Sequence, residues 1–200
     1  MFKSLFAAAL ALCLAGSALA QTAPTVRIRG TVAALSGQTL TVNGRDGQKV
    51  EIALADTLTV VTVKKVDLAS IVAGSYIGTA TRTGADGKPQ AIEVLVFPEA
   101  MRGAGEGHYA WDLEPGSMMT NGNIDGVTAA AVGRDLTVSY KGEKITVHVP
   151  ADVPVVTFAP AEKADLKVGA PVFLTATKAA DGHMTAARVT VGKDGVAPPM

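Results

Sequence analysis

The stretch Thr39–Leu54, with the sequence TLTVNGRDGQKVEIAL, contains two alternating patterns separated by a turn. Leu40 and Val42 alternate with threonines before the turn, and apolar residues occupy every second position from Val50 to Leu54 after it. A period of two with one apolar face is typical of half-buried antiparallel strands. Asp46-Gly47 lies between the two patterns, and glycine adopts the positive φ of a tight hairpin turn without steric cost. The stretch therefore predicts a β-hairpin with one buried face.

A similar pattern returns later in the chain, and the two copies align with one gap. Leu136-Thr137-Val138 repeats Leu40-Thr41-Val42 at an offset of 96 residues, and after the gap Val155-Val156-Thr157 repeats Val60-Val61-Thr62 at an offset of 95. Further matches in the same order are Gly30 with Gly126, Gly74 with Gly169, Asp86-Gly87 with Asp181-Gly182, and Val94 and Val96 with Val189 and Val191. We interpret these identities as an internal duplication with copies at 25–97 and 121–192, and we expect both copies to share a fold.

Turn spacing and glycine content predict the fold class. Short alternating segments are separated by turn residues, and each copy contains one short helical turn that ends at Gly74 or Gly169. We expect an all-β protein with two tandem OB-like small β-barrel repeats, because closing a sheet removes its exposed edges. The expected domains are a first barrel at 21–97, an inter-repeat loop at 98–122, a second barrel at 123–192 and a flexible tail at 193–200.

Residues 1–20, MFKSLFAAALALCLAGSALA, have the pattern of a secretory signal peptide. Lys3 precedes an apolar run, and Ala18-Leu19-Ala20 forms a small-residue cleavage site. A retained membrane anchor is the alternative, but the run is shorter than the roughly 20 residues that span a bilayer. We therefore expect cleavage after Ala20, a periplasmic protein and no stable membrane insertion after cleavage. Cys13 would leave with the signal, so no disulfide or thiolate ligand would remain.

The charge balance argues against nucleic acid as a partner. The chain has 18 Lys and Arg against 18 Asp and Glu, so no basic excess is present to neutralise phosphates. The strands carry Thr and Ala where a stacking platform would carry aromatic and basic residues. Small basic groups occur at Arg27, Arg29, Lys64 and Lys65, and we interpret them as a solvated face.

The segment 98–122, PEAMRGAGEGHYAWDLEPGSMMTNG, has no counterpart in either copy and admits two interpretations. In the first, large apolar side chains fill a barrel end or the seam between barrels, because Trp and Met fill such gaps well. These side chains are Trp111, Leu113, Met118 and Met119. In the second, the segment contacts an unknown protein or small ligand through His108, Trp111, Asp112, Met118 and Met119. Within this second interpretation, His108 and Asp112 are candidate metal ligands, and the carboxylates of Glu106 and Glu114 are further potential ligands.

Residues for catalysis do not form a recognisable pattern. The chain lacks a G-x-S-x-G elbow, and we expect His148 on the solvated face of a strand and His183 in a hairpin. We therefore expect neither enzymatic activity nor a cofactor. The sequence favours a periplasmic, non-catalytic binding or structural protein with an unknown ligand, and a metal-binding or metal-delivery protein that uses the inter-repeat loop is the alternative.

Both copies resemble a bacterial exported domain family of unknown function, whose tandem domains are taken to be OB-like. The resemblance rests on Gly126, Leu136-Thr-Val138, Val155-Val-Thr157, Asp165-Leu-Lys-Val-Gly169 with Val172, and Ala186 with Val189 and Val191. It implies the fold and no catalytic residues. Segment 97–113 is similar to small exported proteins that are often labelled metal ABC transporter permease. That label cannot describe this chain, because a permease needs several apolar spans of about twenty residues.

Overall fold

The computed structural model describes residues 23–198, which form twelve strands and three short 3-10 turns. The strands are β1 (Thr25–Ser36), β2 (Thr39–Gly44), β3 (Lys49–Lys65), β4 (Tyr76–Thr83), β5 (Pro89–Val96), β6 (Gly107–Ala110), β7 (Met118–Ala129), β8 (Arg134–Tyr140), β9 (Glu143–Val149), β10 (Val155–Pro160), β11 (Pro171–Lys178) and β12 (Met184–Val191). The turns are η1 (Leu68–Ser70), η2 (Glu99–Met101) and η3 (Lys163–Asp165). The prediction of an all-β barrel fold is confirmed. The predicted signal peptide lies outside the described residues, and within them no helix is long and apolar enough to cross a membrane.

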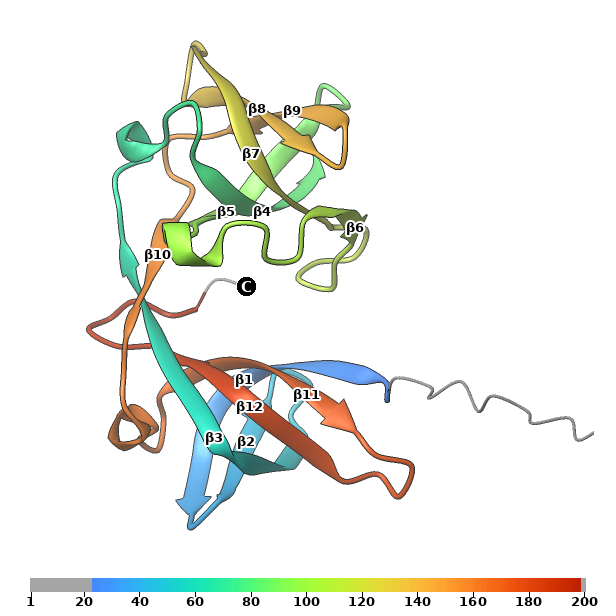
Figure 1. Cartoon of the computed structure of the whole chain (residues 1–200), viewed down its shortest axis with the longest axis vertical. Coiled ribbons are helices and arrows are strands. Elements are labelled where there is room, and N and C mark those ends of the chain that lie inside the picture. Colours follow the sequence, from blue (N-terminus) through green and yellow to red (C-terminus); the bar gives the residue numbers. More distant parts are fainter. Residues whose placement is uncertain (1–22, 199–200) are drawn as a thin grey trace, which may run out of the picture.

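The lower barrel in Figure 1 is a closed ring of five strands. Strand β2 lies between β1 and β3, β12 pairs with β3 in parallel, and β11 joins β12 to β1. The alternating residues predicted from the sequence point inward, and Leu40, Val42 and Ile52 are fully buried. Their neighbours in the core are Ile28, Val32, Leu54, Val60, Val172, Leu174, Ala176, Ala186, Val189 and Val191. Burial of these aliphatic side chains holds this barrel together.

The upper barrel repeats the same pairing scheme with β4, β5, β7, β8 and β9. Strand β7 pairs with β4 and β8, β8 pairs with β9, and β4 pairs with β5. The ring closes where β5 meets β9 in parallel, at Gln90 opposite His148. Its core contains Ile77, Ala91, Val94, Ile124, Leu136, Val138, Val147 and Val149.

The strands are distributed between the barrels differently from the predicted domains. The first barrel takes β1–β3 from the N-terminal half and β11 and β12 from the C-terminal half, whereas the second takes β4, β5 and β7–β9. Figure 1 shows this exchange as blue and cyan strands beside orange and red ones in one barrel. The expectation that 21–97 and 123–192 each form their own barrel is therefore wrong. Each half of the chain contributes three strands to one barrel and two to the other.

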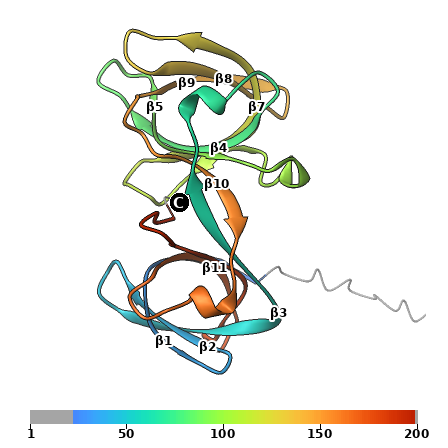
Figure 2. The ribbon, with the colours of Figure 1, turned by 90° about the vertical axis from the view of Figure 1, so that its left-hand side faces the viewer.

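The long strand β3 and the short strand β10 carry the chain between the barrels and cause the exchange (Figure 2). Strand β3 has 17 residues, a length of roughly 55 Å at the usual rise per residue, and it leaves the first barrel to pair with β10. The pairing centres on Val63 opposite Phe158. Val63, Leu95 and Val156 are buried there in a small apolar cluster. Because β3 runs on instead of turning back, the strands that follow it enter the other barrel.

The segments that follow the crossing also pack against the core of the barrel that they enter. Ile71, which follows η1, is fully buried in the core of the second barrel. Leu166, which follows η3, is buried in the core of the first. Each predicted helical turn therefore exists as a 3-10 turn, and each supplies one apolar side chain to the barrel built mainly from the other half of the chain.

The strand register corrects one match of the predicted duplication. The bulge of β1 lies between Val32 and Ala34, and the bulge of β7 lies between Ile124 and Gly126. Gly30 therefore corresponds to Gly122 and not to Gly126. A Cβ on Gly30 would overlap the carbonyl oxygen of Asn43, and one on Gly122 would overlap that of Ser139, whereas nothing lies near a Cβ on Gly126. Close approach of the neighbouring strand explains why both positions carry glycine.

The predicted boundaries of the inter-repeat loop and of the tail also change. Met118–Gly122 belongs to β7, and Gly107–Ala110 forms β6 beside it, so 98–122 is not one loop. The expected flexible tail turns back at Lys193–Val196 through paired backbone hydrogen bonds. Val196 packs beside the apolar cluster at the crossing, so the described part of the tail, up to residue 198, lies between the two barrels (Figure 1).

Candidate binding site at the mouth of the first barrel

The mouth of the second barrel is filled by β6. This strand pairs with residues Met118–Asn121 of β7, alongside the end of β8. His108 is the inward residue of β6: its Nδ1 lies 2.8 Å from Thr120 Oγ1, and its ring stacks on Tyr140 at 5.8 Å between centroids. The cavity that remains beside His108 has a volume of about 120 Å³, and its walls include Pro89 and Ile145. We call this place the filled mouth.

The corresponding place in the first barrel is open. The register equates Met118 with Val26, Ile145 with Val50, and Pro89 with Met184. These counterparts line a cavity of about 590 Å³ together with Arg27, Ile28, Arg29, Gly44, Arg45, Asp46, Gln48, Asp112 and Leu113. We call this cavity the open mouth. The residues Val26–Arg29 of β1 pair with β11 on one side only, and no strand among the described residues takes the position that β6 takes beside β7.

Arginines and one tryptophan surround the open mouth. Arg29 Nη2 lies 2.9 Å from Asp112 Oδ1, and Arg27 Nη1 lies 3.7 Å from the same oxygen. The guanidinium of Arg27 stacks over Trp111 at 3.9 Å from the ring centroid, and that of Arg29 lies 4.9 Å from the ring of Phe173. Guanidinium groups stacked in this way are held against the aromatic rings instead of being surrounded by water. The interpretation of Arg27 and Arg29 as a solvated face is therefore wrong for Arg29, whose side chain is only 8% exposed.

Arg29 and Glu93 are buried without full hydrogen bonding. Within residues 23–198, Nε and Nη2 of Arg29 and both carboxylate oxygens of Glu93 make no hydrogen bond, since the contact of Arg29 with Asp112 is an ion pair that lacks hydrogen-bond direction. Glu93 lies on β5 of the other barrel and is 1% exposed. Burial raises the pKa of Glu93 to about 8, although the charges of Arg29 and Arg45 oppose the shift. Buried polar groups are normally satisfied, so this cluster is exceptional.

The segment between η2 and β7 bridges both barrels. Arg102 holds it to the second barrel by donating to Asn123 and to the carbonyl of Gly74, and Asn121 Nδ2 donates to the carbonyls at 104 and 105. Trp111 and Asp112 hold it to the first barrel through Arg27 and Arg29. The side chain of Ser117 closes the turn after Trp111 by donating to the Trp111 carbonyl at 3.1 Å. The segment thus forms one wall of the open mouth.

The structure divides the predicted site residues into two groups. His108, Met118 and Met119 belong to the filled mouth, where Met119 is buried opposite Tyr109, while Trp111 and Asp112 stand at the open mouth. The candidate metal ligands line different cavities, and each has another partner: Thr120 for His108, and two arginines for Asp112. Among the described residues, no group of three His, Cys, Asp or Glu side chains could hold a metal ion.

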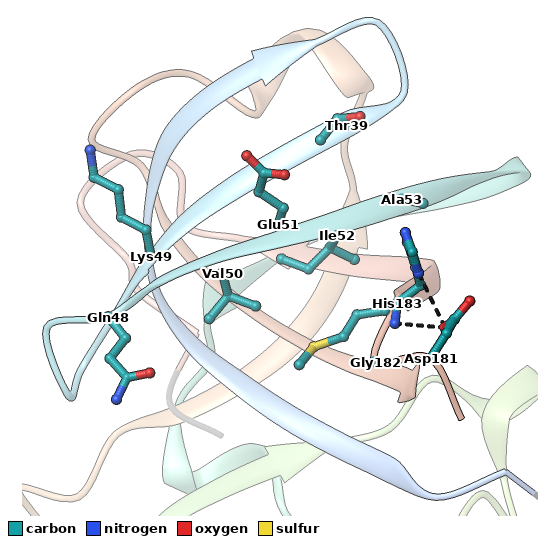
Figure 3. A pocket seen from close by; sticks show the side chains of 11 residues that line it. Thr39, Gln48, Lys49, Val50, Glu51, Ile52, Ala53, Asp181, Gly182 and His183 are labelled. Carbon is teal, nitrogen blue, oxygen red and sulfur yellow. Dashed lines mark hydrogen bonds and ion pairs between the residues drawn. The ribbon is translucent and has the colours of Figure 1, made fainter. Parts of the chain in front are cut away.

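Each of the three histidines lies beside one polar side chain. His108 lies beside the Thr120 hydroxyl, but Thr120 is fully buried and cannot reach a substrate. His148 and His183 pair with Asp135 and Asp181 at 2.8 and 3.1 Å, on a strand face and in a hairpin as expected. Figure 3 shows the His183 pair at one end of a second cavity, of about 690 Å³, beside β3. The His183 side chain is 84% exposed there, and its partner Asp181 shapes the hairpin turn by accepting the His183 backbone N–H.

Sequence reasoning did not find the open mouth. Arg45 and Met184 lie far from the inter-repeat segment in the chain, and only the ring closure of the barrel brings Met184 to Val26 and Val50. The one signal that could have helped is the pair Arg27 and Arg29 in the alternating segment of β1. The corresponding residues of β7, Met119 and Asn121, are uncharged.

Comparisons with models of protein families, with curated proteins and with solved structures found no match. The resemblance to an exported domain family therefore stays a prediction. The fold and the cavity define the chain as a protein of two small β-barrels with a basic, aromatic-rimmed cavity at the mouth of one of them.

Proposed function

We propose that the chain is an exported, non-catalytic binding protein that holds its ligand in the open mouth of the first barrel. The observation that carries this proposal is Arg29, a residue that lines this cavity and whose buried Nε lacks a hydrogen-bond partner among the described residues. Arginine buried in this way is unfavourable unless its remaining donors are used, and a bound ligand uses them. The signal-like residues 1–20 support export, and the internal duplication stays part of the proposal as the origin of the two barrels.

The cavity itself has the properties of a binding site. Its volume of about 590 Å³ lies within the range of roughly 300–1,000 Å³ that ligand sites occupy. Its floor is apolar at Val50 and Met184, and its rim carries Arg27, Arg29 and Arg45. An apolar floor with a few directed polar groups is the common composition of such sites.

Trp111 provides a direct test because it is the only tryptophan of the chain and stacks on Arg27 at the rim. We expect at least one member of a library of anionic, neutral and cationic small molecules and peptides to shift the Trp111 emission and raise the melting temperature. The matched variants are Arg29→Lys, which removes the planar donor fork at the open mouth, and Arg82→Lys, which changes the same residue type beside the filled mouth. Binding that Arg29→Lys weakens and Arg82→Lys leaves unchanged supports the proposal. Binding that is the same in both variants, or no binding by any compound at about 1 mM, contradicts it.

A further inference from the structure

Strand β6 on β7 shows how an extended segment can close a barrel mouth in this protein. Gly107–Ala110 pairs in antiparallel register with Met118–Asn121, and the inward side chain of His108 then fills the cavity down to about 120 Å³. The equivalent edge of the first barrel is Val26–Arg29, and the cavity there is about 590 Å³. The two mouths therefore differ in that the second barrel has a short strand beside β7, whereas the first barrel has no strand at the corresponding place beside β1 among the described residues.

The backbone of β1 is directed to receive such a strand. The carbonyl of Arg29 accepts a hydrogen bond from Arg45 N–H on the side away from β11, so the backbone groups of Arg29 face that side and its carbonyl is already engaged there. Backbone direction in a strand repeats every second residue, and the N–H and carbonyl of Arg27 therefore face the same edge. A strand that pairs there makes the same kind of ladder that β6 makes with β7.

The side chains around this edge specify the chemistry of the segment. Val26 and Ile28 point toward the core, so residues opposite them enter the cavity and must be apolar. Arg27 and Arg29 point to the opposite face, so the peptide residues that lie opposite them should be acidic. Asp112 already provides one carboxylate to these two arginines, while Arg45 at the rim forms none of the ion pairs seen among the described residues.

From this geometry we propose that the open mouth binds an extended peptide segment of a partner protein, with alternating acidic and apolar residues, as an added strand on Val26–Arg29 of β1. This inference rests on the proposed function and names its partner class. The peptide takes the place that β6 takes in the second barrel, with its acidic side chains toward Arg27, Arg29 and Arg45. Its apolar side chains cover Val50 and Met184.

Three capped hexapeptides test the proposal by calorimetry and Trp111 fluorescence on the chain that lacks residues 1–20. The first, Ser-Glu-Val-Glu-Val-Ser, has the proposed pattern. The second, Ser-Lys-Val-Lys-Val-Ser, reverses the charge, and the third, Ser-Glu-Pro-Glu-Pro-Ser, keeps the acids but lacks the N–H groups that a ladder needs. We expect the first to bind roughly tenfold or more tightly than the other two, with slower amide exchange at Arg27.

The variants separate this inference from the proposed function. Arg45→Gln, at an exposed site that does not endanger folding, is expected to weaken the first peptide severalfold, and Arg82→Gln is the matched control. Equal binding of the Glu-Val and Glu-Pro peptides, or binding that Arg45→Gln does not change, overturns strand addition. Binding of citrate or inorganic phosphate without binding of any peptide also overturns it, yet leaves a ligand in the open mouth and the proposed function intact. Failure of every peptide and small molecule overturns both.

Discussion

Glu93 is a carboxyl group buried between the two barrels, opposite Arg29 and Arg45. Desolvation raises its pKa to about 8, so the folded protein holds a proton that an unfolded chain, with the ordinary pKa of 4.5, releases. The arginines do not reverse the shift, because no ion pair within 4.0 Å joins either of them to Glu93 among the described residues. A neutral Glu93 therefore coexists with the charged Arg29 at the seam.

The stability of the protein should depend on pH through this residue. As pH rises from about 4.5 to about 8, the unfolded chain loses the Glu93 proton and the folded protein keeps it, so the free energy of unfolding falls. Glu93→Gln should remove most of this slope and make the protein more stable than wild type near pH 8. Urea unfolding of both proteins at several pH values measures the effect, with the exposed Glu51→Gln as control. A wild-type stability that rises over this interval, or an unchanged slope in Glu93→Gln, contradicts the assignment.

At the scale of strands, glycine positions fix the register of β1 and β7, which occupy corresponding places in the two barrels. Gly30 and Gly122 both lie where the neighbouring strand leaves no room for a Cβ, and Gly126 lies in open space after the bulge. The identity between Gly30 and Gly126 in the sequence is thus coincidental, and the four-residue shift arises because the hairpin between β7 and β8 is four residues longer than the one between β1 and β2.

Two matched substitutions test this register. Gly122→Ala should destabilise the protein by about 1–3 kcal/mol, because its methyl group would overlap the carbonyl of Ser139 and force the strands apart. Gly126→Ala should change the stability little, since its methyl group meets no atom within 4 Å. Denaturant unfolding at constant pH compares the two. Equal effects would show that β7 pairs with β8 in a different register.

At the scale of the whole molecule, each barrel depends on both halves of the chain. Strands β11 and β12 supply two of the five strands of the first barrel, and β4 and β5 supply two of the second. In this structure neither half closes a barrel by itself, and removing two strands from either ring would expose its core and its edges. The two barrels should therefore unfold together in one transition.

A cut between the halves should leave the molecule assembled. A protease site inserted between Pro115 and Gly116, both exposed, allows cleavage without touching a barrel strand. We expect the two fragments to elute together at the mass of the uncut protein and to separate only in denaturant. The uncut insertion variant is the control. Fragments that separate in native buffer would show that each half folds alone, as the duplication by itself suggested.

The sequence by itself determined the local structure of this protein. The period of two in Thr39–Leu54 and its counterpart defines strands and their buried faces, and Asp-Gly pairs define hairpin turns, because both depend only on neighbouring residues. The two interpretations of the inter-repeat segment could not be separated in this way, and its residues in fact divide between a filled and an open mouth.

Only the tertiary structure decided which strands share a barrel and where the cavity lies. Two similar copies offer each strand two similar partners, one in its own half and one in the other half, so local pattern cannot choose between them. The choice follows from β3, which is too long for one barrel and carries the chain across the seam. That crossing also buries Arg29 and Glu93 between the barrels and brings Met184 beside Val26. Residues that line the open mouth are therefore far apart in the sequence, and the sequence alone could not predict this cavity.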